Sequence, residues 1–317
     1  MGIADFLQPF AASLTYICVL AIATFAITLI YKTSATTNFA QGSIAIFAAY
    51  VGCKIFVNHG VPFWICVIIG FVIGFIFGVV VDVGIFRRGR YVNLAGKQII
   101  TMGLVLIITS IMPMIGLIFD YDPSIPPLVK VDDIANVVKD NNLLIPMGNG
   151  VLNLPIQGLV SVGLTVIILG ILFALLRFSK WGLGVRTTAS NEYVAQMMGV
   201  NTHVITAVSW GIAGGLGALA ATMYVSGPGI LSGPFFMTDF QVNAFLAGIL
   251  GGFSTFGGPI VGALLIPLMR TTINLLANID GLEFVTRWNV AIVYIIALIV
   301  ILIKPNGIFG KRIAKKV

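Results

Sequence analysis

The sequence predicts an all-α membrane protein, a polytopic bundle of transmembrane helices in which some helices are broken. Of its 317 residues, 58% are hydrophobic and only 9% are charged, a charge content well below that of a water-soluble domain. Several apolar runs reach the length of about 20 residues that an α-helix needs to cross a bilayer. The chain length suits one compact unit, and we expect residues 1–317 to form a single transmembrane domain.

Eight apolar segments are expected to cross or enter the membrane. In chain order they are Ala11–Tyr31, Phe39–Val57, Pro62–Phe86, Ile99–Phe119, Leu154–Phe178, Val204–Val225, Phe235–Leu276 and Val285–Ile303. The seventh segment has roughly 40 residues, which as one helix is about twice the hydrocarbon thickness. We therefore expect a break at its glycine-rich stretch, Gly251–Pro259. The sequence leaves open whether the first arm crosses fully or re-enters at half depth.

Another break is expected at the start of the second segment, where Thr36–Ser43 combines polar side chains with a glycine. In chain order, we call Thr36–Ser43 the first break and Gly251–Pro259 the second break. Two interrupted segments, one in each half of the chain, are typical of unwound helix ends that line a path through a bilayer. The alternative is an ordinary interfacial turn followed by a tightly packed helix. The predicted path residues are Asn38, Phe39, Gln41, Gly42, Ser43, Gly251, Gly252, Ser254 and Thr255.

The distribution of charge predicts the orientation in the membrane. One arrangement puts 13 of the 18 basic residues on the cytoplasmic side, namely Lys32, Arg87, Arg88, Arg90, Lys97, Arg177, Lys180, Arg186, Lys304, Lys311, Arg312, Lys315 and Lys316. The excess of lysine and arginine on one side decides the topology. The acidic residues that then lie outside are Asp5, Asp120, Asp122, Asp132, Asp133, Asp140, Asp239, Asp280 and Glu283. The N-terminus is then external and the C-terminus cytoplasmic. Residues 179–203 are then expected to form a cytoplasmic loop, and residues 120–153 an external loop. The external loop either contacts a partner protein, acts as a lid or simply connects two spans. The net charge of +7 is explained by this topology rather than by nucleic-acid binding.

Catalytic and ion-coupling chemistry find little support in the sequence. Asp82 is expected to pair near the cytoplasmic end of its span, while Lys54 and Arg270 are expected to snorkel or to face protein. The spans carry no series of carboxylates or histidines of the kind that ion-coupled carriers use. The sequence has neither HExxH nor a phosphate loop of the form GxxxxGK[ST]. If ATP drives transport, its hydrolysis belongs to another polypeptide, so we expect a transport subunit rather than an enzyme.

Small residues recur four positions apart in two spans, as Gly70, Gly74 and Gly78 and as Gly211 with Gly215. Helices in lipid approach closely through such residues, so this spacing predicts helix packing. A subunit interface is the alternative. The cysteines, Cys18, Cys53 and Cys66, lie in apolar runs, and their spacing suits neither zinc nor a disulfide framework.

The longest polar interruption of the second half, Ser179–His203, is expected to hold a short helix. Asn191 is a suitable N-cap before Glu192, and Gly199 suits the left-handed residue that ends a helix. Its apolar side consists of Tyr193, Val194, Met197 and Met198. Such a helix either lies on the membrane surface or docks into a groove of a partner protein.

Five segments together resemble the permease subunits of ABC importers for branched-chain amino acids. They appear in the family's order between residues 38 and 310, and they are Asn38–Gly42, Gly182–Asn201, Ala221–Tyr224, Ala244–Ala263 and Lys304–Gly310. The resemblance implies a bundle with two internally related halves. It also implies that the short helix is a coupling helix seated on an ATPase, with coupling residues Arg186, Asn191, Glu192, Ala195, Met198 and Gly199.

The resemblance further implies the partners and the location of this subunit. The partners are a second homologous permease, two cytoplasmic ATPase subunits and an external solute-binding protein. ATP and Mg then belong to the ATPases, and no cofactor is expected in this chain. The location is the bacterial inner membrane, and the cargo is a branched-chain or other hydrophobic amino acid.

Two departures from the family pattern concern the substrate. Gln41 replaces the usual histidine, and Ser254–Gly257 is more polar than the usual turn. A different hypothesis is therefore a stand-alone channel or facilitator for a small neutral solute such as urea or an amide. A purely structural membrane protein is a third, but broken helices are tolerated at depth only where protein or a cavity covers them. The sequence leaves open the substrate, the pairing of permeases and the residues that contact substrate.

Overall fold

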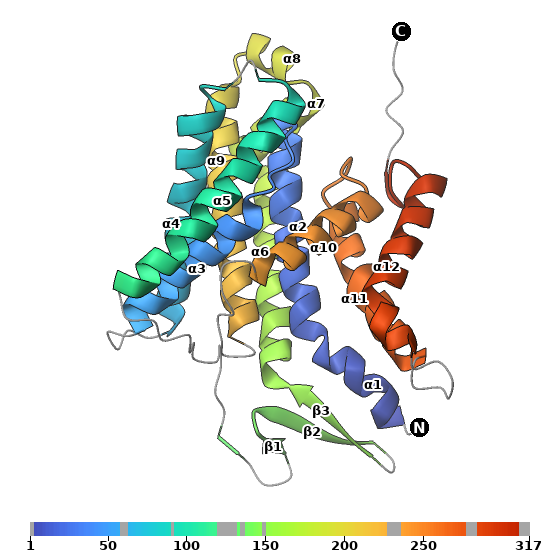
Figure 1. Ribbon diagram of the computed structural model, residues 1–317. Helices are drawn as coiled ribbons and strands as arrows, with labels where there is room; N and C mark the ends of the chain where they lie inside the picture. The colour runs from blue at the N-terminus through green and yellow to red at the C-terminus, as the bar shows by residue number, and fades with distance from the viewer. Residues whose placement is uncertain are drawn as a thin grey trace.

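The computed structural model is a bundle of α-helices with one small sheet at an end, which confirms the predicted fold class (Figure 1). It describes residues 3–57, 63–89, 92–118, 132–133, 137–147, 150–226, 236–276 and 284–310. The first half contains α1 (Ile3–Ala12), α2 (Leu14–Ser34), α3 (Gln41–Val57), α4 (Phe63–Val81), the π-helical turn η1 (Asp82–Phe86) and α5 (Leu94–Ile118). The second half contains α6 (Ile156–Phe178), α7 (Lys180–Ser190), α8 (Glu192–Met197), α9 (Thr202–Val225), α10 (Phe236–Gly251), α11 (Gly258–Leu276) and α12 (Phe284–Ile303).

Within the described residues, seven helical segments are long and apolar enough to cross a membrane. They correspond to the predicted spans except the second, which is the short helix α3. The predicted break in the long seventh segment is confirmed, because α10 and α11 are separated by residues 252–257. Boundaries differ at the first segment, which begins at Ile3 rather than Ala11, and at α5, which begins at Leu94 rather than Ile99. The internal relation of the two halves stays a prediction.

The centre of the bundle is the pair α2 and α9. In the most apolar window of α9, 78% of the residues are buried, whereas the share in α12 is 17%. The sequence explains this difference, because α9 is rich in glycine and alanine and α2 is apolar on all sides, so neighbours can pack around both. The peripheral helices α5, α6 and α12 expose aliphatic side chains, as expected for surfaces against lipid or another subunit.

Close backbone contact joins α4 to α9. A Cβ atom added to Gly74 would lie 2.5 Å from the carbonyl oxygen of Gly214, and one added to Gly78 would lie 2.2 Å from that of Trp210. These distances are shorter than any real Cβ contact, so glycine is required at both positions. The predicted packing role of the small residues is confirmed for these two helices.

The two ends of the bundle differ in character. Figure 1 shows α7, α8 and the end of α12 at one end, and α1 and the sheet at the other. We call these the α8 end and the sheet end. The α8 end carries Arg87, Lys97, Lys180 and Lys304, which the charge analysis assigned to the cytoplasm. Several charged residues on which the predicted orientation depends lie outside the described residues. They are Arg90, Asp120, Asp122, Asp280, Glu283, Lys311, Arg312, Lys315 and Lys316.

The predicted external loop contains a sheet that the sequence analysis did not predict. Its antiparallel strands β1 (Val138–Lys139), β2 (Asn142–Met147) and β3 (Gly150–Pro155) lie in the order β1-β2-β3, with Asn142 opposite Pro155 and Met147 opposite Gly150. The side chain of Gln8 on α1 exchanges two hydrogen bonds of 2.9 Å with the backbone of Asn153, which satisfies part of the edge of β3. Because β3 extends to Pro155, α6 begins at Ile156 instead of Leu154.

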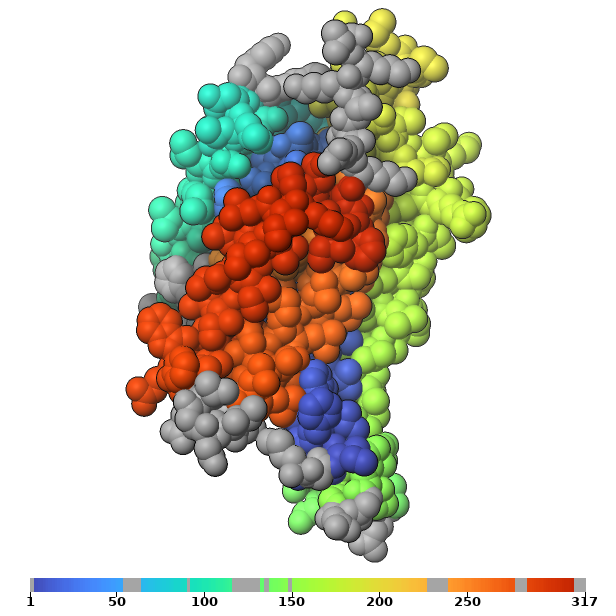
Figure 2. All heavy atoms as spheres, turned by 90° about the vertical axis from the view of Figure 1, so that its right-hand side faces the viewer, coloured from blue at the N-terminus to red at the C-terminus, as the bar shows by residue number. Residues whose placement is uncertain are grey.

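On the face shown in Figure 2, α12 crosses over α11, with the N-terminal helix and the sheet below them. The side-chain amide of Asn289 on α12 donates a 2.9 Å hydrogen bond to the carbonyl of Arg270 on α11. This contact fixes one turn of α11 against α12 in the part of the bundle nearer the sheet end.

Candidate functional site

The polar segment 179–203 forms two helices rather than the single short helix predicted. The α6 helix ends at Phe178, and Ser179 begins α7 at once, because its side-chain oxygen accepts a 2.9 Å hydrogen bond from the amide of Gly182. Glycine is required at 182, where a Cβ atom would lie 2.3 Å from the carbonyl oxygen of Leu175. The α7 helix thus folds back tightly on α6 and carries α8 at its end.

The predicted caps of α8 are confirmed. The side-chain oxygen of Asn191 accepts a 3.1 Å hydrogen bond from the amide of Val194. At the other end Gly199 adopts a φ of 84°, in the left-handed region that favours glycine. The chain then turns directly into α9, where the Gln196 side chain donates a 2.8 Å hydrogen bond to the Thr202 hydroxyl.

One side of α8 is buried and the other is exposed. Ala195 is 3% exposed, so it is the contact of α8 with its own subunit. Tyr193, Met197 and Met198 are 71%, 74% and 80% exposed, and Val194 is 52% exposed. We call these four residues the α8 apolar face. Large apolar side chains gathered on one short helix at the polar end of a membrane protein are typical of a docking or membrane-surface contact.

The two remaining predicted coupling residues are Arg186, on α7, and Glu192, at the start of α8. Arg186 on α7 is exposed, and its guanidinium donates a 3.4 Å hydrogen bond to the carbonyl of Arg177. Glu192 lines a polar, partly open hollow at the α8 end. The other residues of its lining are Ser34, Thr36, Asp82, Phe86, Arg87, Lys97, His203 and Thr206. In this hollow the first residues of α8 lie beside the first helix break, to which Thr36 belongs.

The first break is held by hydrogen bonds from three other helices. Ala35 ends α2 in the left-handed conformation, with a φ of 49°. Asn38 donates a 3.1 Å hydrogen bond to the side-chain oxygen of Gln41, whose amide donates a 2.7 Å hydrogen bond to the carbonyl of Ala213 on α9. Thr101 on α5 accepts a hydrogen bond from the amide of Phe39.

Gln241 on α10 is the residue of this site that sequence reasoning missed. Its side-chain oxygen accepts a 2.6 Å hydrogen bond from the amide of Gly42. Its amide donates to the carbonyl of Asn38 at 3.2 Å and to that of Phe39. One glutamine thereby satisfies backbone groups that the helix break leaves without helical partners. The signal in the sequence is slight, because Gln241 is only one of several polar residues at the start of the seventh segment, with Asp239 and Asn243 nearby.

A small cavity, which we call the central cavity, lies beside the first break. It is lined by Ala23, Ile27, Gln41, Gly42, Ala45, Gly217, Phe240, Gln241 and Ala244. The cavity has room for about one water molecule, so an amino acid does not fit in this conformation. The predicted path residues Asn38, Gln41 and Ser43 are 1%, 3% and 4% exposed. The first break is therefore a closed, protein-covered element here.

The second break lies at the α8 end, against the last described residues of the chain. The amides of Ile308 and Phe309 donate hydrogen bonds of 2.7 Å and 3.2 Å to the carbonyls of Leu250 and Gly251, the last residues of α10. Lys32 on α2 donates a 2.7 Å hydrogen bond to the carbonyl of Ser254. The Thr255 hydroxyl accepts from the amide of Gly258 at the start of α11.

The structure thus divides the predicted path residues into two groups. The first break contacts α5, α9 and α10, whereas Gly251, Gly252, Ser254 and Thr255 belong to a turn that packs against Lys304–Gly310. The glycine-rich segment and the chain's final motif, which are far apart in sequence, form one structural unit. A role in lining a path stays a prediction for both groups.

Comparison with known proteins agrees with this architecture. Residues 10–303 match the family model described as branched-chain amino acid transport system / permease component. The probable branched-chain amino acid transport permease protein LivH of Methanocaldococcus jannaschii is 27% identical over 288 residues, which cover 90% of this chain and 86% of that protein.

Other relatives match over shorter stretches. The high-affinity branched-chain amino acid transport system permease protein BraD of Pseudomonas aeruginosa is 26% identical over 171 residues, 53% of this chain and 52% of that protein. The autoinducer 2 import system permease protein LsrC of Salmonella paratyphi B is 30% identical over 125 residues, 38% of this chain and 36% of that protein. No solved structure matches. Because the family model covers most of the chain, this protein belongs to the family of branched-chain amino acid transport system permease components.

Proposed function

We propose that this permease is the membrane subunit of an ATP-driven importer for branched-chain or other hydrophobic amino acids. Two cytoplasmic ATPase subunits bind ATP and Mg, a second homologous permease completes the membrane part, and an external binding protein delivers the solute. The chain lies in the cell's inner membrane with its N-terminus external and its C-terminus cytoplasmic. The family and the named relatives support the transport role and the substrate class.

The α8 apolar face is the observation that carries the proposal. Its four side chains are exposed on a short helix that its own caps and the buried Ala195 hold in place. The face belongs to the end that the charge analysis assigns to the cytoplasm. A groove on an ATPase would remove these side chains from water, which favours docking by roughly 25 cal/mol for each Å² of apolar surface buried.

The hollow beside α8 supports a mechanism for coupling. Arg87 donates a 3.2 Å hydrogen bond to the carbonyl of His203, which joins η1 to the start of α9. Glu192 of α8 and Thr36 of the first break line the same hollow. A movement of α8 by the ATPases would act on α9 directly and on the first break across this hollow. Rearrangement of that break would then alternate access to the central cavity.

The experiment measures ATP-dependent uptake of labelled leucine by vesicles that contain the complete importer and its binding protein. Met198→Asp places a charge on the α8 apolar face, and we expect it to reduce uptake at least tenfold while the chain inserts normally. Leu94→Asp is the matched control, because Leu94 is 55% exposed at the same end but lies outside α8. Unchanged uptake in Met198→Asp would contradict the coupling role of α8. Leucine flux through the chain alone, without ATP, would favour a stand-alone facilitator.

A further inference from the structure

Arg270 is a charged residue inside a membrane-spanning helix, six positions before the end of α11 at Leu276. It lies on the side of α11 that also carries Ala263, Ile266 and Ile273, all of which are buried. The guanidinium therefore faces the protein. The sequence left open whether Arg270 snorkels to the membrane surface or faces protein. Keeping a cation at this depth is costly, and such residues generally mark a path or a binding site.

The Nε atom of Arg270 is buried and makes no hydrogen bond within the described part of the chain. A buried donor without an acceptor costs about 1–3 kcal/mol, and more when it is charged. The favoured partner for a guanidinium is a planar anionic group such as a carboxylate. An arginine held in this way is prepared for an acceptor that the described residues do not supply at Nε.

Aromatic side chains from other helices surround this position. The guanidinium lies close enough to Tyr16 on α2 and Tyr224 on α9 to interact with them electrostatically. The ring of Phe240 on α10 lies 4.9 Å from that of Tyr16 and 5.1 Å from that of Tyr224. Asn243 donates a 3.0 Å hydrogen bond to the Tyr16 hydroxyl, and it accepts a 3.2 Å hydrogen bond from the hydroxyl of Tyr294 on α12.

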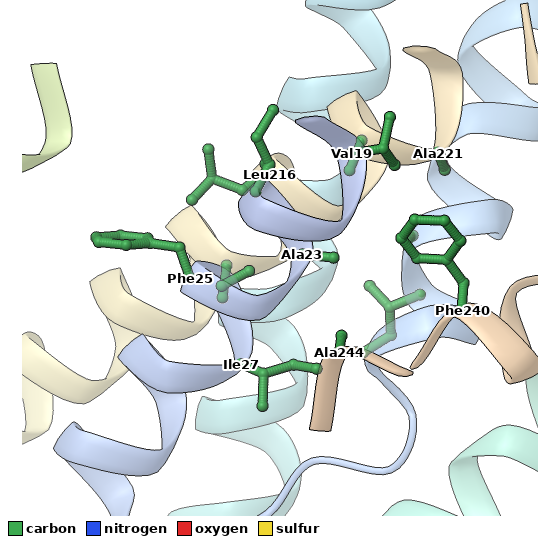
Figure 3. Close-up of a cluster of buried hydrophobic side chains, with 14 of the residues drawn as sticks. Val19, Ala23, Phe25, Ile27, Leu216, Ala221, Phe240 and Ala244 are labelled. Atoms are coloured by element: carbon green, nitrogen blue, oxygen red, sulfur yellow. The ribbon is translucent and has the colours of Figure 1, made fainter. Parts of the chain in front are cut away.

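This cluster lies toward the sheet end of the bundle. Tyr16 is in the first turn of α2, and Tyr224 is in the last turn of α9. Phe240 stands between the cluster and the central cavity, because its ring contacts both tyrosines and also lines that cavity. Figure 3 shows the Phe240 ring reaching from α10 toward the pair of helices that carries Ala23 and Ala221.

We propose that Arg270, Tyr16, Tyr224 and Phe240 form an external receiving site for the carboxylate of the imported amino acid, with Phe240 separating that site from the central cavity. The inference rests on the proposed function and adds a substrate-binding role for this chain. The guanidinium binds the carboxylate, and the aromatic rings provide an apolar wall for an aliphatic side chain. Displacement of Phe240 then opens the way to the cavity beside Gln41 and Gln241.

The test measures binding of small-molecule probes to the purified full-length chain in nanodiscs of phosphatidylcholine. Saturation-transfer NMR detects the bound probe. The probes are leucine, 4-methylpentanoate, which keeps the carboxylate but lacks the ammonium group, and isopentylamine, which lacks the carboxylate. We expect the first two to bind and isopentylamine to give no signal. Equal binding of isopentylamine, or no binding of leucine, overturns the proposal.

Substitutions assign the binding to Arg270. Arg270→Gln should raise the Kd for leucine at least tenfold, and Arg270→Lys should retain part of the affinity because it keeps the charge without the planar fork. Arg287→Gln, which removes an exposed arginine from α12, is the matched control and should change nothing. An unchanged Kd in both Arg270 variants overturns the proposal. The lysine variant keeps the test valid if the glutamine variant fails to fold.

An anionic lipid headgroup offers the same kind of oxygen atoms, so a second set of nanodiscs contains phosphatidylglycerol. The solute site predicts the same leucine signal in both lipids. A signal that falls as phosphatidylglycerol rises assigns the site to lipid and overturns the proposal. Uptake by the complete importer is measured separately. Uptake that does not depend on Arg270 counts against this site alone, whereas carboxylate binding without ATP-driven uptake counts against the proposed function alone.

Discussion

The side-chain oxygen of Gln241 accepts a 2.6 Å hydrogen bond from the backbone amide of Gly42, across 199 positions of sequence. The same glutamine donates to the carbonyls of Asn38 and Phe39. The first helix break, in the first half of the chain, is therefore stabilised by a helix from the second half. Irregular backbone at membrane depth persists only where protein or water satisfies it, and here one side chain provides much of that satisfaction.

We predict that Gln241→Leu destabilises the chain more than the removal of another buried glutamine. Hydrogen bonds between helices in membranes average about 0.6 kcal/mol and reach about 1.7 kcal/mol, so the loss of these contacts should cost about 2–3 kcal/mol. Gln157→Leu is the comparison, since Gln157 is also buried and donates to the Met223 carbonyl and the Ser226 hydroxyl at the end of α9. Its cost should be about 1 kcal/mol.

Thermal unfolding of both variants in the same detergent provides the measurement. Uptake by the assembled importer should also fall further in Gln241→Leu, because its contacts hold the break beside the central cavity. Equal destabilisation by the two variants would show that the break does not depend on Gln241.

Ala195 in α8 is buried, whereas Met198 at the C-terminal cap of α8 is exposed. Substitutions at these two positions therefore separate two effects that the sequence alone does not distinguish. Ala195→Asp buries a carboxylate where 3% of the side chain is exposed, so it should cost at least about 2 kcal/mol of stability and reduce uptake. Met198→Asp changes a side chain that is 80% exposed and should alter stability by no more than about 0.5 kcal/mol. Its loss of uptake then reflects docking. Comparable unfolding temperatures for the two variants would contradict this assignment.

The sequence was sufficient to predict the spans, the break between α10 and α11, and the caps of α8. Each of these features depends on local properties, such as the length of an apolar run, or Asn191 and Gly199 at the ends of a short helix. The partners of the breaks were not predictable. Gln241 has the same local sequence whether its amide faces a helix break, a cavity or another subunit.

The partner of the second break was missed for a related reason. The sequence shows glycines that allow a sharp turn, but it does not show that Ile308 and Phe309 donate to the end of α10. The sheet β1–β3 was missed because prolines and mixed charges in residues 120–153 favoured an irregular loop. Its β3 strand is held partly by Gln8, which lies 145 positions away in sequence.

The contact between Gly252 and Gly307 predicts a requirement for glycine in the chain's final motif. Gly307 has a φ of 82°, and a Cβ atom there would lie 2.4 Å from the Cα atom of Gly252. Gly307→Ala should therefore separate Lys304–Gly310 from α10 and destabilise the chain by about 1–3 kcal/mol. Gly257→Ala is the control in the second break, because nothing lies within 4 Å of its Cβ position.

Limited proteolysis with chymotrypsin measures this separation, since Phe309 lies within the motif and is followed by Gly310. Cleavage after Phe309 should be faster in Gly307→Ala than in the wild type and unchanged in Gly257→Ala. Equal cleavage rates in the three proteins would mean that the backbone contact does not hold the motif in place.

The close backbone contact between α4 and α9 is the basis of the last prediction. A Cβ atom on Gly74 would lie 2.5 Å from the carbonyl oxygen of Gly214, and one on Gly214 would lie 2.2 Å from that of Gly74. The obstacle in both cases is backbone, which cannot rotate away as a side chain does. Gly74→Ala must therefore push α4 from α9, and we expect a cost of about 1–3 kcal/mol.

Gly103→Ala on α5 is the matched change, because its Cβ position is open and alanine favours a helix over glycine by up to about 1 kcal/mol. The two variants should shift the unfolding temperature in opposite directions, Gly74→Ala downward and Gly103→Ala upward or not at all. Because α9 follows directly after α8, a displaced α9 should also weaken ATP-dependent uptake in Gly74→Ala. If Gly74→Ala unfolds at the wild-type temperature, the close approach of α4 to α9 does not contribute to stability, and the small-residue spacing requires another explanation, such as a subunit contact.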